Sequence, residues 1–156
     1  SQENIRHMEQ MNDASTLERT RAMAEILRLN PDILKSQEAL QGICNDLGAT
    51  QICITNEFGI ITAGVPKSVI GFDLSRHAQS RPFLKCITTP GYEMIQRPQS
   101  NAQGGIHMQY CAVSRLDAPG AVQLGFTPQH EQSVRASIDF EKLVLTTSHI
   151  NIFSFF

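Results

Sequence analysis

The first thirty residues contain neither glycine nor proline, and this constrains the fold more than any other feature of the chain. Residues able to share one helix face recur there at steps of three, four and seven: Ile5, Met8, Met11, Ser15, Ala22, Ile26 and Leu29. Such spacing is typical of an amphipathic helix. Because Pro31 disfavours helical backbone in the residue before it, we expect one long helix that ends at Asn30. Its first half is so polar that we expect it to project from the domain, free to pair with a second copy or to continue another helix.

A second helix and a hairpin are predicted next. Ser36 is a good N-cap, and Gly48 suits the position just beyond a helix C-terminus. After Gly48 the hydrophobic period changes from that of helices to that of strands. The stretch QICITNEFGIITAG (51–64) predicts two short strands around a turn at 56–59.

The rest of the chain predicts further short elements and no repeats. In order, we expect a loop at 65–71, a short helix at about 75–87 interrupted before Pro82, a strand at 92–99, strands at 106–116 and 121–126 around a tight turn at 117–120, and a mostly helical tail from 129. About five strands joined by hairpins predict one antiparallel sheet. Helices on one face of that sheet would make an α+β domain.

Length and composition exclude several classes of protein. A chain of 156 residues with 41% hydrophobic and 18% charged residues suits one ordinary globular domain. A formal charge of −2 gives no electrostatic reason to expect nucleic acid or an anionic membrane as a partner. We find no apolar run long enough to span a bilayer and no signal peptide, and a start at Ser suits a segment cut from a longer protein.

Catalytic and metal-binding motifs are missing from the sequence. It contains no G-x-S-x-G, no P-loop, no G-x-G-x-x-G and no metalloprotease histidine motif. We therefore expect no catalytic residue, no metal ligand and no cofactor, although His77 and His107 can form a metal or haem site if they meet in space. The four cysteines are widely spaced among apolar residues, which predicts buried free thiols at Cys44, Cys53, Cys86 and Cys111.

A polar run before Pro82 contains three candidate binding residues. The guanidinium of Arg81 can hold a carboxylate in a bidentate pair, or it can form a surface salt bridge or cap a helix end. Phe83 can be a pocket wall or a plain core aromatic. Gln79 can donate hydrogen bonds to a ligand, or it can lie on an exposed helix face.

Three more candidates lie in the predicted late hairpin. Tyr110 is mid-strand, and a buried tyrosine hydroxyl needs a partner, which can be a ligand or another protein group. Asp117 can capture an ammonium group, but aspartate before Ala-Pro-Gly is also an ordinary turn opener. Gln123 points to the strand face opposite Val122 and Leu124, where a polar residue indicates water, a polar pocket or an interface.

Three phrases and the long first helix match a known family in order and spacing. The phrases are ITNEFGIITAG (54–64), IGFDLSRHAQSRPFL (70–84) and MQYCAVSRLDAPGAVQLGF (108–126). Over residues 15–130 they resemble the Cache family of extracytoplasmic sensor domains, with an Arg-Pro-aromatic segment and with a late hairpin whose Tyr and Asp lie near the pocket. The chain departs from the family at Phe83, where many members have Trp, and at Leu84, where a second aromatic is common.

The resemblance implies a PAS-like, five-stranded antiparallel sheet preceded by a long helix. It divides the chain into a dimerisation and signal helix at 1–30, a ligand-sensing core at 31–130, and a helix and linker toward an output module at 131–156. The ligand-binding residues that we assign to this core are Arg81, Phe83, Tyr110, Asp117, Gln79 and Gln123.

The function that follows is small-molecule sensing by the extracytoplasmic domain of a bacterial transmembrane receptor. We expect a small polar ligand such as a carboxylate or an amino acid, a homodimer formed through the N-terminal helix, and attachment to the cell membrane only by flanking helices outside this chain. A histidine kinase is the first candidate for the output, and a diguanylate cyclase, a chemoreceptor or a phosphatase are others. The alternatives are a cytoplasmic PAS- or GAF-type regulatory domain of a transcription factor and a ligand-free dimerisation module.

Overall fold

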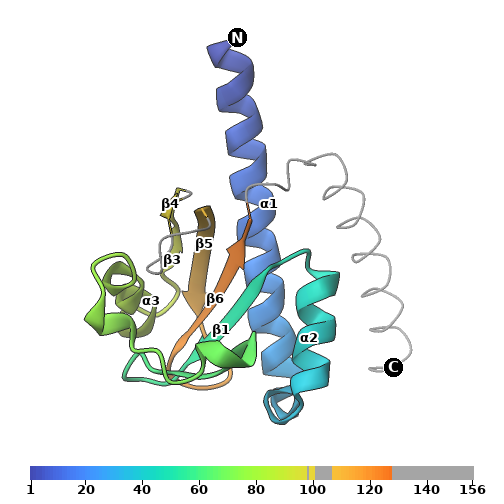
Figure 1. The fold of residues 1–156 in the computed structure, drawn as a ribbon, viewed down its shortest axis with the longest axis vertical. Helices are drawn as coiled ribbons and strands as arrows, with labels where there is room; N and C mark the ends of the chain where they lie inside the picture. The colour runs from blue at the N-terminus through green and yellow to red at the C-terminus, as the bar shows by residue number, and fades with distance from the viewer. Residues whose placement is uncertain (98, 101–106, 128–156) are drawn as a thin grey trace.

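One long helix, α1 (Gln2–Leu29), runs along the molecule and projects beyond it (Figure 1). The structure is a computed structural model that describes residues 1–97, 99–100 and 107–127. The hydroxyl oxygen of Ser1 accepts a hydrogen bond from the Asn4 N–H at 3.2 Å, and the helix ends before Asn30. Its buried side chains all lie in the second half: Thr16, Arg19, Thr20, Met23, Ala24 and Leu27. The predicted long helix and its projecting polar half are both confirmed.

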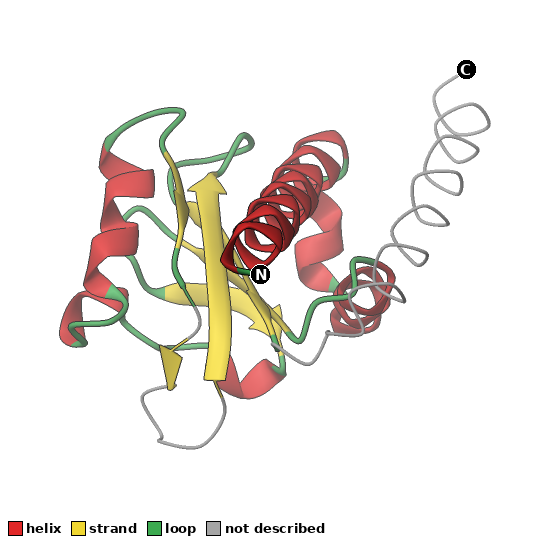
Figure 2. Cartoon of the chain, turned by 90° about the horizontal axis from the view of Figure 1, so that it is seen from above, coloured by secondary structure: helices red, strands yellow, loops and turns green. Residues whose placement is uncertain are grey.

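The second helix, α2 (Gln37–Asp46), follows a short 3-10 turn, η1 (Pro31–Lys35). The Ser36 hydroxyl oxygen accepts a hydrogen bond from the Ala39 N–H at 3.1 Å, as its N-cap position predicts. Gly48 has a φ of 65°, a left-handed conformation that favours glycine, and it lies just after the helix. Helices α1 and α2 lie on the same face of the sheet (Figures 1 and 2).

The sheet is antiparallel and mixes early and late parts of the sequence. Its strands are β1 (Gln51–Thr55), β2 (Ile61–Val65), β3 (Glu93–Ile95), β4 (Gln99–Ser100), β5 (His107–Ser114) and β6 (Ala121–Phe126). The order is β2-β1-β6-β5-β3, and the two-residue β4 pairs with the start of β5. The predicted α+β fold with a five-stranded antiparallel sheet is confirmed, with β4 as an addition.

The segment between β2 and β3 crosses the other face of the sheet as a series of short turns. These are η2 (Lys67–Val69), η3 (Leu74–Arg76), η4 (Arg81–Leu84) and α3 (Lys85–Thr88). We expected one short helix here and helices on one face only, so this part of the prediction needs correction. The predicted interruption before Pro82 is present, because Pro82 lies in the first turn of η4, where its missing N–H is tolerated.

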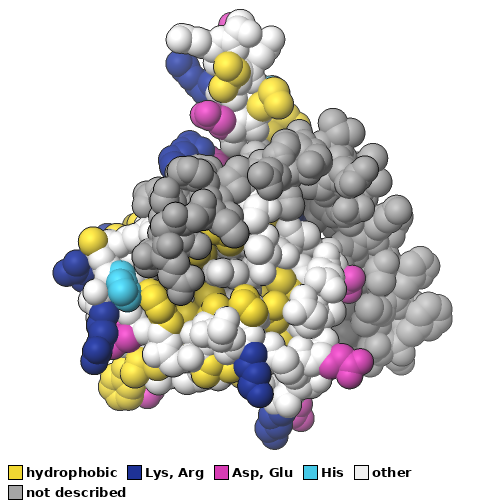
Figure 3. All heavy atoms as spheres, viewed as in Figure 1, with side chains coloured by type: hydrophobic (Ala, Val, Ile, Leu, Met, Phe, Trp, Pro, Cys, Tyr) yellow, Lys and Arg dark blue, Asp and Glu magenta, His cyan; other side chains and the backbone are white. Residues whose placement is uncertain are grey.

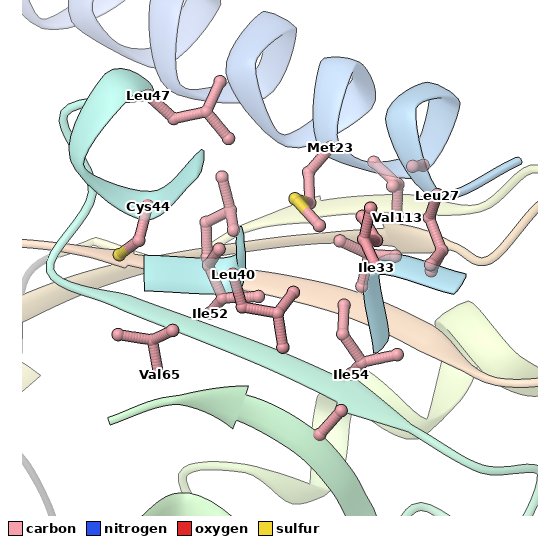
Figure 4. Close-up of a cluster of buried hydrophobic side chains, with 14 of the residues drawn as sticks. Met23, Leu27, Ile33, Leu40, Cys44, Leu47, Ile52, Ile54, Val65 and Val113 are labelled. Atoms are coloured by element: carbon pink, nitrogen blue, oxygen red, sulfur yellow. The ribbon is translucent and has the colours of Figure 1, made fainter. Parts of the chain in front are cut away.

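Alternate residues of each strand therefore meet different partners. On the helix face, strand residues such as Ile52, Ile54 and Leu124 pack with Met23 and Leu27 of α1 and with α2 (Figure 4). On the opposite face, which we call the crossover face, a smaller cluster is formed by Cys53, Ile61, Leu74, Phe83, Cys86, Ala112 and Ala121. The side-chain period of two along a strand explains this division.

Two further sequence predictions can be checked in the described ranges, and one cannot. All four cysteines are free and buried, as expected. Within the described ranges, no helix combines the length and the apolar character that a membrane span requires. The predicted helical tail from residue 129 lies outside the described residues.

Candidate functional site

A cavity of about 390 Å³ lies between the crossover face of the sheet and the crossover segment. Strands β1, β2, β5 and β6 form its floor, and residues from Pro66 to Phe83 form its walls. The described residues that line it are Gln51, Cys53, Ile61, Pro66, Ser68, Val69, Phe72, Leu74, His77, Gln79, Ser80, Phe83, Tyr110 and Gln123. This size is at the lower end of the range for small-molecule pockets.

One row of the floor places Tyr110 and Gln51 on either side of Gly125. The strand register pairs Gly125 with both residues, one on each neighbouring strand. The Tyr110 hydroxyl donates a hydrogen bond to Gln51 Oε1 at 3.3 Å. A Cβ at position 125 would lie 3.0 Å from Tyr110 Cε1, so only glycine leaves room for the tyrosine ring to lie across β6. The absence of a side chain at Gly125 therefore allows Tyr110 and Gln51 to form a polar part of the cavity floor.

Gln123 lies in the next row of the floor between two small side chains. Its neighbours in register are Cys53 on β1 and Ala112 on β5. Only 5% of Gln123 is exposed, and the residue lines the cavity. Small neighbours leave empty space above the sheet, and Gln123 presents an amide to that space.

Gln79 presents a second amide from the crossover. Its Nε2 is buried and has no hydrogen-bond partner among the described residues. Its main-chain carbonyl accepts a hydrogen bond from Gln96 Nε2 at 2.8 Å, and the Gln96 N–H donates to the Tyr110 carbonyl at 2.8 Å. Gln96 thus links the crossover wall to the floor, and the Gln79 backbone is fixed relative to Tyr110.

Aromatic side chains form the apolar parts of the cavity. The Phe83 ring contacts the Tyr110 ring edge to face, with centroids 6.4 Å apart and planes at 74°. Phe72 and the more exposed His77 stack at 4.7 Å with planes 13° apart. The Ser80 hydroxyl, in contrast, is already used, since it donates to the Leu74 carbonyl at 2.7 Å.

The described lining of the cavity combines apolar side chains with polar groups other than lysine, arginine or carboxylates. Among its described lining residues there is no lysine, arginine, aspartate or glutamate. Burial raises the pKa of the Cys53 thiol to about 12 and the pKa of the Tyr110 phenol to about 12, so both groups stay protonated at neutral pH. In the described ranges no group of three or more His, Cys, Asp or Glu side chains is arranged to hold a metal ion.

Comparison with known proteins identifies the fold. No protein-family model and no curated protein match the sequence. An extracellular ligand-binding receptor from Desulfohalobium retbaense DSM5692 matches 76% of this chain and 23% of its own length, with 21% identity and a TM-score of 0.53. The ligand-binding domain of the Campylobacter jejuni chemoreceptor Tlp3, in complex with 4-methylisoleucine, matches 85% of this chain at 11% identity and a TM-score of 0.54. The chain therefore shares the fold of these ligand-binding domains. It spans 56% of the Tlp3 domain's length, and it aligns in the same way with the isoleucine-bound Tlp3 sensory domain at a TM-score of 0.53.

Four of the six predicted binding residues line the same cavity. They are Gln79, Phe83, Tyr110 and Gln123. The cavity is also lined by residues that the sequence analysis missed, including Gln51, Ser68 and Phe72. The signal that could have found Gln51 is its register opposite Gly125, which depends on knowing that the first strand pairs with the last.

The structure does not place the other two predicted residues, Arg81 and Asp117, at the cavity. Arg81 is exposed and lies outside the cavity lining. The inward positions of this stretch are Ser80, Phe83 and Cys86, which recur at the three-residue spacing of a 3-10 turn, so the residue after Ser80 faces outward.

Asp117 is used by the protein itself. Its two carboxylate oxygens accept hydrogen bonds from Arg115 Nε and Nη2 at 3.0 and 2.7 Å, and both side chains are less than 10% exposed. Arg115 Nη1 also donates to the Thr55 carbonyl at 2.8 Å. The pair fixes the turn between β5 and β6, so the alternative in which Asp117 shapes a turn agrees with the observed contacts.

Proposed function

We propose that this chain is the extracytoplasmic, small-molecule-sensing domain of a bacterial transmembrane signalling receptor. The observation that carries the proposal is the cavity of about 390 Å³, which is lined by residues from the sheet and the crossover together. A ligand held there contacts both parts of the fold at once. The structural neighbours support the proposal, because they are described as an extracellular ligand-binding receptor and as a chemoreceptor domain with isoleucine or 4-methylisoleucine bound.

The signal would pass from the cavity to α1 through hydrogen bonds that join α1 to strands β3 and β5. Arg21 of α1 forms a bidentate pair with Glu93 of β3 at 2.5 and 2.6 Å. Gln109 of β5 donates to Asp13 Oδ1 at 3.0 Å and accepts from Asn12 Nδ2 at 3.2 Å. A ligand that binds one arrangement of sheet and crossover more tightly would favour that arrangement, and these contacts would move α1 with it.

The projecting part of α1 is where we propose that two copies of the chain pair. Ile5, Met8 and Met11 recur at three-residue steps and are 57%, 59% and 61% exposed. Figure 3 shows apolar side chains on this projecting part of the molecule. Analytical ultracentrifugation should find a dimer that the triple change of these residues to Gln converts to a folded monomer. A monomer at high protein concentration in the unchanged chain would contradict the pairing.

The catalytic step of signalling belongs, in this proposal, to an output module outside the chain. A histidine kinase is the first candidate, followed by a diguanylate cyclase, a chemoreceptor signalling domain or a phosphatase. Sequencing the complete gene tests the membrane attachment directly. Apolar runs of about twenty residues on both sides support a receptor, while a flanking helix-turn-helix supports a cytoplasmic regulator instead.

Thermal unfolding across a ligand panel tests the sensing role itself. The panel contains amino acids, organic acids, amines and uncharged amides, each at about 10 mM. A ligand at about one hundred times its Kd stabilises the folded state by about 2.7 kcal/mol, which is a clear rise in Tm. A flat response to every class of compound would count against a sensor and in favour of a ligand-free dimerisation module.

A further inference from the structure

The cavity offers no partner for a charged ligand among its described lining residues. An ionised carboxylate or ammonium group that leaves water needs an opposite charge to compensate its lost hydration. The lining provides amides, hydroxyls, aromatic rings and one imidazole, that of His77. His77 is exposed and stacked on Phe72, which leaves the interior without formal charge. A zwitterionic amino acid would leave both of its charges unpaired there.

The interior does contain an unused hydrogen-bond donor. Gln79 Nε2 is buried without a partner in the described part of the chain, and a buried donor in that state is unfavourable. Its backbone is fixed through the hydrogen bond between its carbonyl and Gln96. Because Gln79 lines the cavity, a turn of its side chain would bring this donor to a carbonyl oxygen of a ligand.

Other polar groups of the cavity can accept a hydrogen bond from an N–H group of the same ligand. The side-chain amide of Gln123 lies in the floor of the cavity. Gln51 Oε1 accepts a single hydrogen bond from Tyr110 at 3.3 Å, and a carbonyl-type oxygen has a second lone pair to offer. An N–H group of the ligand can therefore find an acceptor on the floor while its apolar part contacts Phe83 and Phe72.

We infer that the cavity binds an uncharged molecule with a carboxamide or similar N–H and C=O pair on an apolar frame, and that Gln79 Nε2 donates to its carbonyl oxygen. This inference rests on the proposed function and narrows the ligand class. It differs from the carboxylate ligand expected from the sequence, because that expectation required Arg81 at the cavity.

Matched pairs of probes test the charge of the ligand. We would compare benzamide with benzoate, nicotinamide with nicotinate, hexanamide with hexanoate, and N-acetylisoleucine amide with isoleucine, using thermal unfolding and calorimetric titration. At least one amide should raise the Tm and bind about tenfold more tightly than its charged counterpart. A carboxylate or free isoleucine that binds as tightly as its neutral partner would overturn the inference.

The change Gln79→Met tests the assigned donor. Methionine keeps the length of the side chain and the main-chain carbonyl that Gln96 contacts, but it removes the amide. We expect the Tm without ligand to stay the same or rise, because the unpaired donor is gone, and the affinity for the amide probe to fall about tenfold. Gln41→Met on the exposed face of α2 is the matched control and should change neither quantity. Unchanged amide affinity in Gln79→Met would refute the role of Gln79.

The same panel separates this inference from the proposed function. If carboxylates or amino acids bind and amides do not, the sensing role stands and the uncharged-ligand inference fails. If no compound of any class binds the unchanged protein, the proposed function fails and the inference fails with it.

Discussion

The two faces of the sheet are built from alternate residues of the same strands, yet only one of them is filled. On β6, Val122, Leu124 and Phe126 face α1 and α2 and are at most 3% exposed. Their neighbours Ala121, Gln123 and Gly125 face the crossover, and Gln123 lines a cavity. Both faces of β6 share one backbone, so the difference in packing between them comes from the side chains and from the elements that cover each face.

The covering elements explain why one face is filled and the other is hollow. Long helices present a continuous row of large side chains such as Met23, Leu27 and Leu40, which fill the space over the sheet. The crossover is a set of turns of three or four residues that approach the sheet at a few points only, such as Leu74 and Phe83. We conclude that the helix face supplies most of the stability and that the crossover face is available for binding.

Adjacent positions on β6 provide the strongest test of this comparison. Leu124→Ala should lower the free energy of unfolding by about 3 kcal/mol, because it opens a cavity in a filled region. Gln123→Leu, one residue away, should stay within about 0.5 kcal/mol of the unchanged protein or exceed it, since it replaces an amide that lines the cavity with an apolar group. Urea unfolding followed by circular dichroism measures both. Equal losses from the two changes would mean that the two faces do not differ.

Two glycine-to-alanine substitutions, one at a crowded position and one at an open position, test how tightly the chain packs around β2. A Cβ at Gly64 would collide with the Ile52 carbonyl and lie 2.7 Å from Val69 Cγ2 of η2, so Gly64→Ala should lower the free energy of unfolding by about 2 kcal/mol. Gly42 in α2 has no heavy atom within 4 Å of the same position. Gly42→Ala should therefore raise stability by about 0.5 to 1 kcal/mol through helix propensity. A harmless Gly64→Ala would show that both η2 and the β1 backbone at Ile52 can move away from β2.

The ion pair between α1 and β3 should give a smaller, pH-dependent effect. The Arg21 guanidinium donates hydrogen bonds to Glu93 and lowers the pKa of that carboxyl below its usual value. A lowered pKa in the folded state stabilises the protein above the unfolded pKa, and this stabilisation is lost as pH falls through the folded pKa. Because the pair is largely exposed, we expect a difference of only about 0.5 kcal/mol between the unchanged protein and Glu93→Gln at pH 7. That difference should vanish in acid and shrink in high salt, and a difference that persists at pH 2 would contradict an ionic origin.

The smallest effect is expected at Arg81. Arg81→Ala should change the free energy of unfolding by less than about 0.5 kcal/mol, because the residue is exposed. It should also leave the response to any ligand unchanged, since Arg81 lies outside the cavity lining. Lost ligand binding in a stable Arg81→Ala protein would show that the guanidinium reaches the ligand, as the family resemblance implies.

The sequence correctly predicted those helices and strands whose boundaries are set by a cap, a helix-breaking residue or an alternating hydrophobic pattern. The end of α1 before Pro31, the Ser36 cap and the strand 121–126 agree with the structure because caps, breakers and alternation act within a few residues. The crossover was less predictable, since it has no long hydrophobic period and its turns take their shape from the sheet below. The same is true of the strand order, which no local pattern encodes.

The candidate site divides in a similar way. Gln123 and Tyr110 could be selected from the sequence because a polar group on a strand face that opposes large aliphatic residues is a local signal. Gln51 was missed because its place opposite Tyr110 depends on the pairing of β1 with β6. Arg81 could not be placed because the direction of a side chain in a short 3-10 turn is set by which neighbours the core buries, here Ser80 and Phe83.

The position of β6 between β1 and β5 has a consequence for how the domain is made. Ile52 pairs with Leu124, so the centre of the sheet joins segments from opposite ends of the core, and the closure of that long intervening loop must come before the gain from pairing. During synthesis, the hairpin of β1 and β2 is complete before β6, the other neighbour of β1 in the sheet, has been translated. Until β6 arrives, one edge of β1 is open to other chains, which is the period when the newborn protein is most prone to aggregate.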